Sequence, residues 1–179
     1  MGALQPLSAM SFDAPDTLDM STPQAKRASY ALLAAQVGAV LEGERDRVAN
    51  LAQFSALVYQ SVPELNWAGF YLVRADDELV VGPFQGKVAC VRIPFAKGVC
   101  GAAARTREIQ LVEDVHAFAG HIACDSASRS ELVLPLVTGD GRLVGVFDLD
   151  SPRTARFDEE DARGFAAAVA VLVAGTDWA

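Results

Sequence analysis

The chain contains three cysteines, Cys90, Cys100 and Cys124, all in its central part. An odd number of cysteines argues against a closed framework of structural disulfides. The spacing includes no Cys-x-x-Cys pair, so neither a zinc ribbon nor a thioredoxin-type motif is indicated. Two alternatives remain from the residues themselves: three buried, inert thiols, or a set of thiols that exchange a disulfide.

The surroundings of each cysteine differ. Cys100 follows Gly98 by two residues in the first turn of an expected helix, where unpaired N–H groups and the helix dipole lower a thiol pKa. Lys97 adds a nearby cation, so Cys100 is predicted to be a thiolate, with a packed small residue as the alternative. Cys90 lies within an expected strand, which favours a core thiol. Cys124 lies in a polar loop, and function concentrates in such loops.

Three acidic residues form the second candidate group. Asp148 and Asp150 are two residues apart on an expected strand, so both side chains point to one face. Glu131 begins the partner strand of the same hairpin and can approach them. The functional interpretation is a pair that binds an ammonium group or acts as an acid, because one carboxylate raises the pKa of the other. The alternative is that the strand end has emerged into solvent.

A metal site is a competing interpretation. His116, His121, Cys124 and one other cysteine would supply four zinc ligands, although the spacing of the two histidines is loose. Trp67 and Tyr71 on an earlier expected strand are typical core residues. They also suit the wall of a pocket for a small methyl-bearing cation.

Composition limits the possible partners. The chain has 179 residues, of which 51% are hydrophobic and 21% charged, as in one ordinary globular domain. Its net charge is −8 and its pI about 4.7, which argues against binding to nucleic acid or to an anionic membrane. No secretory signal or membrane-spanning run is visible, so a cytoplasmic location with reduced or catalytic cysteines is expected.

Residues 1–23 lack periodicity and are expected to be a flexible tail, with a single domain over residues 24–179. Apolar periodicity predicts helices over residues 24–41, 44–62, 98–107 and 158–173, and strands over residues 67–73, 79–84, 88–93, 109–112, 131–137 and 142–150. A polar loop is expected over residues 113–129. This order predicts an α+β fold with a mostly antiparallel sheet and helices packed on it.

Taken together, several segments resemble the free methionine-(R)-sulfoxide reductases, a family built on a single GAF domain. The segments are residues 66–72 (NWAGFYL), 82–86 (GPFQG), 98–101 (GVCG) with Cys90, 121–125 (HIACD), 130–135 (SELVLP) and 148–151 (DLDS). The resemblance spans about residues 24–173. It implies a central antiparallel sheet with helices on one face and a ligand pocket on the other.

The resemblance also implies roles. Cys124 would attack the sulfoxide sulfur of free methionine-R-sulfoxide and become a sulfenic acid, and Cys90 would resolve it as a disulfide for a thioredoxin-like reductant. Cys100 would be an auxiliary or second resolving thiol, a role that differs from its expected thiolate state.

For the substrate, the resemblance assigns Glu131, Asp148 and Asp150 to the ammonium and sulfoxide oxygen, and Trp67 and Tyr71 to the methyl group. It implies no metal or other cofactor. The oligomeric state stays open, with a homodimer as one arrangement.

A non-catalytic GAF module that binds a small molecule or senses redox state is the alternative function. Such modules usually regulate an attached output domain, and this chain has little sequence outside the expected domain. Three thiols together with three acids favour catalysis.

Overall fold

A computed structural model describes residues 17–118, 120 and 126–178 of the chain. Its elements are α1 (Pro23–Val40), α2 (Arg47–Ser61), β1 (Trp67–Ala75), β2 (Glu78–Gly86), β3 (Arg92–Pro94), α3 (Gly98–Thr106), β4 (Gln110–Val112), the 3-10 helix η1 (Val115–Ala117), β5 (Ser130–Val137), β6 (Leu143–Ser151) and α4 (Glu159–Gly175). Within these ranges no helix has the length and hydropathy needed to cross a membrane.

Six strands of the described chain form one sheet in the spatial order β3-β2-β1-β6-β5-β4, and every neighbouring pair is antiparallel. The hairpins β1–β2 and β5–β6 meet at the β1–β6 pair in the middle of the sheet. Both hairpins were predicted, the first from two aromatic or β-branched runs on either side of a polar segment and the second from its Gly-Asp-Gly turn. The predicted α+β class with an antiparallel sheet is confirmed.

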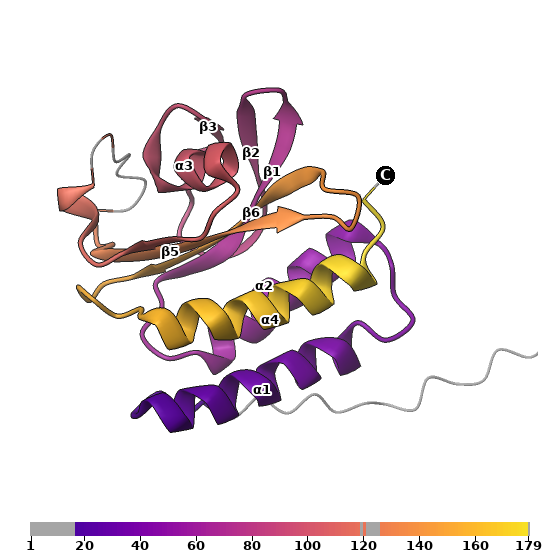
Figure 1. The fold of residues 1–179 in the computed structure, drawn as a ribbon, viewed down its shortest axis with the longest axis vertical. Helices are drawn as coiled ribbons and strands as arrows, with labels where there is room; N and C mark the ends of the chain where they lie inside the picture. The colour runs from indigo at the N-terminus through magenta and orange to yellow at the C-terminus, as the bar shows by residue number, and fades with distance from the viewer. Residues whose placement is uncertain (1–16, 119, 121–125, 179) are drawn as a thin grey trace, which may run out of the picture.

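The two faces of the sheet carry different helices (Figure 1). α2 and α4 pack on one face, and α1 lies against α4 as an outer layer. The core under these helices is rich in aromatic rings, with Phe147 of β6 in contact with Phe54, Phe70 and Phe165. Among the α-helices of the described residues, α3 is the one that covers the opposite face.

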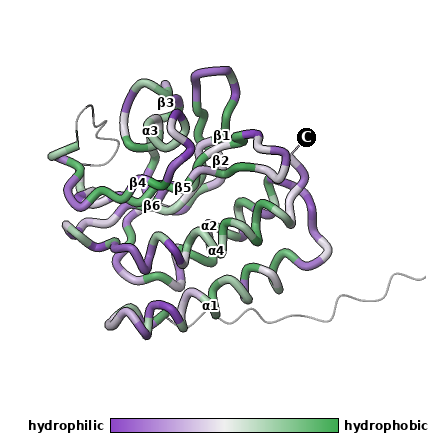
Figure 2. Tube along the Cα trace, viewed as in Figure 1, coloured by the Kyte–Doolittle hydropathy of each residue, from purple (hydrophilic) through white to green (hydrophobic). Residues whose placement is uncertain are grey.

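The sequence specifies where the long helices begin. Thr22, Asp46 and Asp158 each accept a hydrogen bond from a backbone N–H in the first turn of α1, α2 and α4, respectively. Figure 2 shows hydrophobic residues concentrated along α2, α4 and the central strands, and hydrophilic residues in the turn between β1 and β2. The apolar faces of the helices are therefore buried against the sheet.

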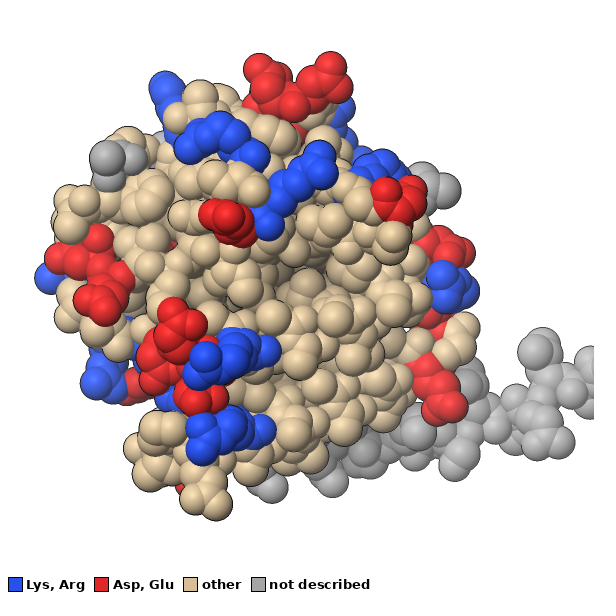
Figure 3. Space-filling view, viewed as in Figure 1, with Lys and Arg blue, Asp and Glu red and all other residues tan. Residues whose placement is uncertain are grey.

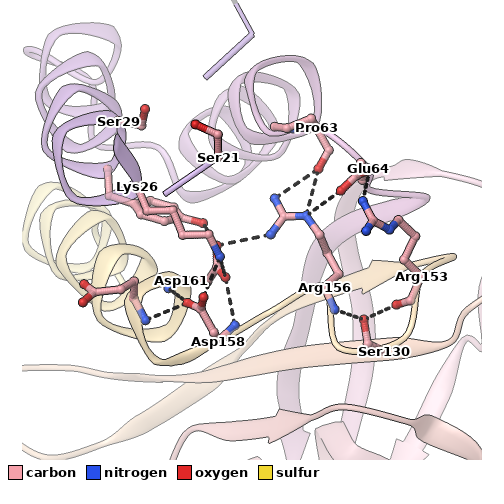
Figure 4. A network of polar contacts seen from close by, with 12 residues as sticks. Ser21, Lys26, Ser29, Pro63, Glu64, Ser130, Arg153, Arg156, Asp158 and Asp161 are labelled. Atoms are coloured by element: carbon pink, nitrogen blue, oxygen red, sulfur yellow. Dashed lines mark hydrogen bonds and ion pairs between the residues drawn. The ribbon is translucent and has the colours of Figure 1, made fainter. Parts of the chain in front are cut away.

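The packed part of the chain begins before α1. Leu18 is buried in the core under the helices, and its N–H donates to the carbonyl of Ser61 at 2.8 Å. The structure thus places Leu18, a residue of the expected tail, in the core, while Asp19, Ser21 and Thr22 are exposed and residues 1–16 lie outside the described ranges. α1 is held to α4 by a network of polar contacts that includes Lys26 and Asp161 (Figure 4).

Candidate active site

The register of the β5–β6 hairpin places three carboxyl groups on the face of the sheet that α3 covers. Glu131 of β5 is paired with Asp150 of β6. Asp148 lies two residues before Asp150 on β6, so its side chain points to the same face. Glu131 is 7% exposed and Asp148 5% exposed, whereas Asp150 is partly exposed. The alternation therefore predicted the shared face correctly, and the chain buries two of the three acids.

α3 brings a thiol to these acids. Cys100 is the third residue of α3 and is buried and unoxidised. Its Sγ lies 3.9 Å from Oε1 of Glu131. One atom each from Cys100, Glu131 and Asp148 lies within 4.8 Å of the other two. We call these three residues the thiol–carboxyl cluster.

Burial keeps protons on this cluster. Desolvation raises the pKa of Glu131 well above its usual value, and the charges of Asp148 and Asp150 raise it further. Desolvation also raises the pKa of Asp148, with the charge of Asp150 as the next cause. At least one carboxyl group is therefore a neutral acid near pH 7, which is the form that donates a proton.

The same surroundings overturn the prediction that Cys100 is a thiolate. Burial raises the pKa of Cys100 well above its ordinary value, and the charges of Asp148 and Glu131 raise it further. The helix N-terminus and the exposed Lys97 do not outweigh these effects. Cys100 is therefore held as a neutral thiol, and the prediction was wrong because it considered only the helix and not the acids facing it.

One oxygen of the cluster has no hydrogen-bond partner among the described residues. It is Oδ1 of Asp148, which is fully buried. An unpaired buried acceptor costs free energy, so native structures rarely leave one without a ligand or water. An acceptor set within several carboxyl groups suits a donor that carries positive charge, such as a primary ammonium.

Aromatic rings stand beside the acids. The Trp67 ring stacks on Tyr71 at 5.6 Å and on Phe84 of β2 at 5.3 Å between centroids, and Trp67 Nε1 donates to the carbonyl of Lys87. A Cβ at Gly69 would lie 2.2 Å from Cβ of Phe84, so only glycine fits there. Sequence reasoning missed Phe84 and Gly69. The cross-strand pairing of these two residues in the predicted hairpin was the signal that could have found them.

Cys90 lies in the connection between β2 and β3, not in a strand. The prediction of a strand over residues 88–93 was wrong for its first four residues, because β2 ends at Gly86 with a φ of 120° and the chain leaves the sheet there. Cys90 is half-buried against the cluster that contains Trp67, and it is disulfide-bonded, so it is not a core thiol. Cys124 lies outside the described residues.

The family model for the GAF domain matches residues 48–174. The chain belongs to the GAF-domain family. Its sheet, covered by helices on one face and by α3 and the candidate site on the other, is the fold that the resemblance implied.

Several proteins and solved structures are similar to this chain over most of its length. Free methionine-R-sulfoxide reductase of Escherichia coli (strain K12) is 51% identical over 152 residues, which cover 83% of this chain and 91% of that protein. Protein YtsP of Bacillus subtilis (strain 168) is 56% identical over 137 residues, covering 76% and 83%. The X-ray structure of free methionine-R-sulfoxide reductase from Neisseria meningitidis in complex with its substrate is 42% identical, with a TM-score of 0.82 over 91% of this chain and 95% of that one. These matches confirm the predicted resemblance.

The competing interpretation of the sequence was a zinc site with His116, His121, Cys124 and one other cysteine, and the structure describes only part of this set. His116 is exposed in η1, and His121 lies outside the described residues together with Cys124. The described side chains that lie within metal-binding distance of one another are those of the thiol–carboxyl cluster instead. The predicted zinc set therefore has no support from the described part of the chain.

An apolar groove of about 440 Å³ lies between β5 and α4, on the other face of the sheet. Ten residues line it, and none of them titrates: Ile109, Leu134, Pro135, Val137, Gly139, Ala166, Val169, Ala170, Val173 and Ala174. Figure 3 shows that uncharged side chains fill the middle of the face toward the viewer and charged ones surround it. The groove offers no acid, base or thiol, so the candidate chemistry belongs to the α3 face.

Proposed function

We propose that this chain reduces free methionine-(R)-sulfoxide to methionine. One observation carries the proposal: a buried group of carboxyl groups, with an unpaired oxygen on Asp148, lies next to a wall of stacked aromatic rings. Such a site matches an amino acid that has a cationic head and an apolar methylthio end. The relatives named free methionine-R-sulfoxide reductases, one of them solved with its substrate, support the same assignment.

The carboxyl groups hold the head of the substrate in this proposal. Asp150 is partly exposed at the end of β6, beside the two buried acids, so it is the acid assigned to the substrate ammonium. Burial raises the pKa of both Glu131 and Asp148, so one of them holds a proton and donates it to the sulfoxide oxygen. Trp67 and Tyr71 contact the methyl group and exclude water from it.

The thiol steps follow from the chemistry of sulfoxides. The thiolate of Cys124 attacks the sulfoxide sulfur, the S–O bond breaks, and oxygen passes to the cysteine as methionine leaves, so Cys124 becomes a sulfenic acid. The thiol of Cys90 then displaces water from that sulfenic acid and forms a disulfide. The disulfide-bonded state of Cys90 supports this pairing. A thioredoxin-like dithiol returns both cysteines to thiols.

Cys100 has an auxiliary place in this scheme. Its neutral, buried thiol lies against Glu131, so it helps to position that carboxyl group and acts as a second resolving thiol. The attack is assigned to Cys124 by the resemblance to the reductase family. The raised pKa of Cys100 agrees with this assignment, because a nucleophilic thiol must ionise near neutral pH.

A coupled assay tests the proposal. Oxidation of NADPH through thioredoxin reductase and thioredoxin is followed with the R and S epimers of free methionine sulfoxide and with methionine-R-sulfoxide inside a peptide. We expect turnover of the free R epimer alone, and none of the peptide, because an acylated amine would leave the Asp150 carboxylate without its cationic partner. Cys124→Ser serves as the inactive control. Equal rates on both epimers would refute the assignment, and binding without turnover would favour a sensing module.

A further inference from the structure

The thiol–carboxyl cluster has the composition of a metal site. Cys100, Glu131 and Asp148 come from three different elements, α3, β5 and β6, and each is buried. Their three candidate ligand atoms lie within 4.8 Å of one another. Sequence spacing could not indicate this set, because the ligands are 31 and 17 residues apart along the chain.

The ligand types select the ion. A thiolate is a soft ligand and excludes Mg²⁺ and Ca²⁺, which prefer oxygen ligands alone. Zn²⁺ accepts thiolate sulfur at about 2.3 Å and carboxylate oxygen at about 2.0–2.2 Å, which puts sulfur and oxygen roughly 3.5 Å apart in a tetrahedron. Sγ of Cys100 and Oε1 of Glu131 are already 3.9 Å apart, so a small side-chain movement would bring both to one ion.

The unpaired oxygen of Asp148 is a second, independent observation that favours a bound cation. Asp148 is only 5% exposed, and its Oδ1 has no hydrogen-bond partner among the described residues. A bound cation would satisfy this oxygen. The cation would also neutralise the negative charge of three ionised side chains that lie close together. Without a cation, bound protons have to neutralise that charge.

We propose that Cys100, Glu131 and Asp148 form a three-ligand site for Zn²⁺ in the reduced protein. The fourth position of the tetrahedron is left for water, as in zinc sites with three protein ligands. The bound ion takes the carboxyl groups that the proposed function gives to the substrate, so ion and substrate exclude each other. The binding itself does not depend on the proposed function, because it concerns the protein without substrate.

Cobalt substitution tests this site without an activity assay. In the double variant Cys90→Ser/Cys124→Ser, Cys100 is the one remaining thiol of the chain. Titration of this variant with Co²⁺ at neutral pH should give a near-ultraviolet thiolate-to-cobalt charge-transfer band that saturates at one ion per chain. Added Zn²⁺ should abolish the band. Adding Cys100→Ala should remove the band.

Carboxylate variants in the same background identify the other ligands. Asp148→Asn and Glu131→Gln should each weaken Co²⁺ binding at least about tenfold, because each removes a charged ligand. Glu108→Gln changes an exposed acid outside the cluster and should leave the affinity unchanged. Circular dichroism verifies that each variant is folded, and the two carboxylate variants are read separately. Absence of a saturable band, or an affinity unchanged in either folded carboxylate variant, would overturn the proposal.

Discussion

Carboxyl groups that lie close together raise one another's pKa, and Glu131, Asp148 and Asp150 form such a group. The difference in burial divides their roles. Glu131 and Asp148 are shielded from water, which raises the pKa of both, whereas Asp150 stays partly exposed at the end of β6. The same chemical group, a carboxyl, thus provides both a proton donor and an anion within one site.

Asp150→Asn tests this division. The amide keeps the shape of the side chain and removes its charge, so the Michaelis constant for free methionine-R-sulfoxide should rise roughly 10–100-fold, the loss expected for one hydrogen bond to a charged group. Steady-state kinetics should show a smaller change in turnover number. Asp76→Asn, in the exposed turn between β1 and β2, is the control. A fall in turnover number alone would make Asp150 the proton donor instead.

The cysteines are separated by single-turnover experiments. Cys124→Ser should release no methionine, since it removes the attacking thiol. Cys90→Ser should release about one equivalent and then stop as a sulfenic acid, because attack precedes resolution. Methionine is measured by chromatography, and the sulfenic acid by trapping and mass spectrometry. If Cys100→Ser abolishes the first turnover and Cys124→Ser does not, the assigned roles are reversed.

At the scale of elements, the start of α4 combines a helix cap with an ion pair. Asp158 accepts hydrogen bonds from the N–H groups of Glu160 and Asp161 and pairs with Lys26 of α1 at 2.9 Å. Although partial burial raises the pKa of Asp158, the hydrogen bond from Lys26 and those from the helix start lower it to about 2. The negative charge of Asp158 therefore stabilises both α4 and its contact with α1.

The lowered pKa predicts a pH-dependent contribution. Because the folded pKa lies below the ordinary value of 3.8, the charge of Asp158 stabilises the fold above about pH 4, and this stabilisation is lost as pH falls toward 2. Asp158→Asn keeps the cap and removes the charge, so it should cost on the order of 1 kcal/mol at pH 7, a value reduced for the exposure of the side chain.

Urea unfolding of both proteins at several pH values measures this contribution. The difference in free energy of unfolding between wild type and Asp158→Asn should shrink as pH falls from 5 to 2. A difference that does not vary with pH would show that the charge has no part in it.

At the scale of the molecule, a buried polar network joins the outer helix to the rest of the fold (Figure 4). Asp161 of α4 is fully buried and is contacted by Nζ of Lys26 at 2.5 Å, by the hydroxyl of Tyr30 at 2.6 Å and by Arg156 at 3.3 Å. The backbone N–H of Arg156 also donates to Ser130, the residue before Glu131. The network therefore connects α1 and α4 to the start of β5, next to the candidate site.

Lys26→Met should destabilise the whole molecule. Methionine preserves most of the apolar stem but leaves the charge of Asp161 to Arg156 and Tyr30, which should cost about 2–4 kcal/mol. Unfolding should remain a single transition, since α1 packs along α4 over its length. Lys97→Met, at an exposed position, is the control. A loss below about 0.5 kcal/mol at Lys26 would show that the pair is not stabilising.

The local sequence pattern was sufficient to predict those features that depend on a single helix or strand. The alternation along β6 determined that Asp148 and Asp150 share a face, and the acidic start of α4 determined its cap, because both depend on neighbours within a few residues. The Cys90 segment shows the limit of that rule. Its residues alternate like a strand, but the chain leaves the sheet after Gly86, and only Arg92–Pro94 pairs with β2.

The sequence by itself indicated the acids and thiols of the candidate site and the antiparallel hairpin that carries the acids. Tertiary structure alone decided that α3 covers those acids with Cys100, that a glycine at position 69 lets Phe84 meet Trp67, and that the thiol keeps its proton. Desolvation and charge repulsion act between residues that are far apart in the chain and close in space. Their effect on a pKa or on an ion site therefore depends on packing, which periodicity does not contain.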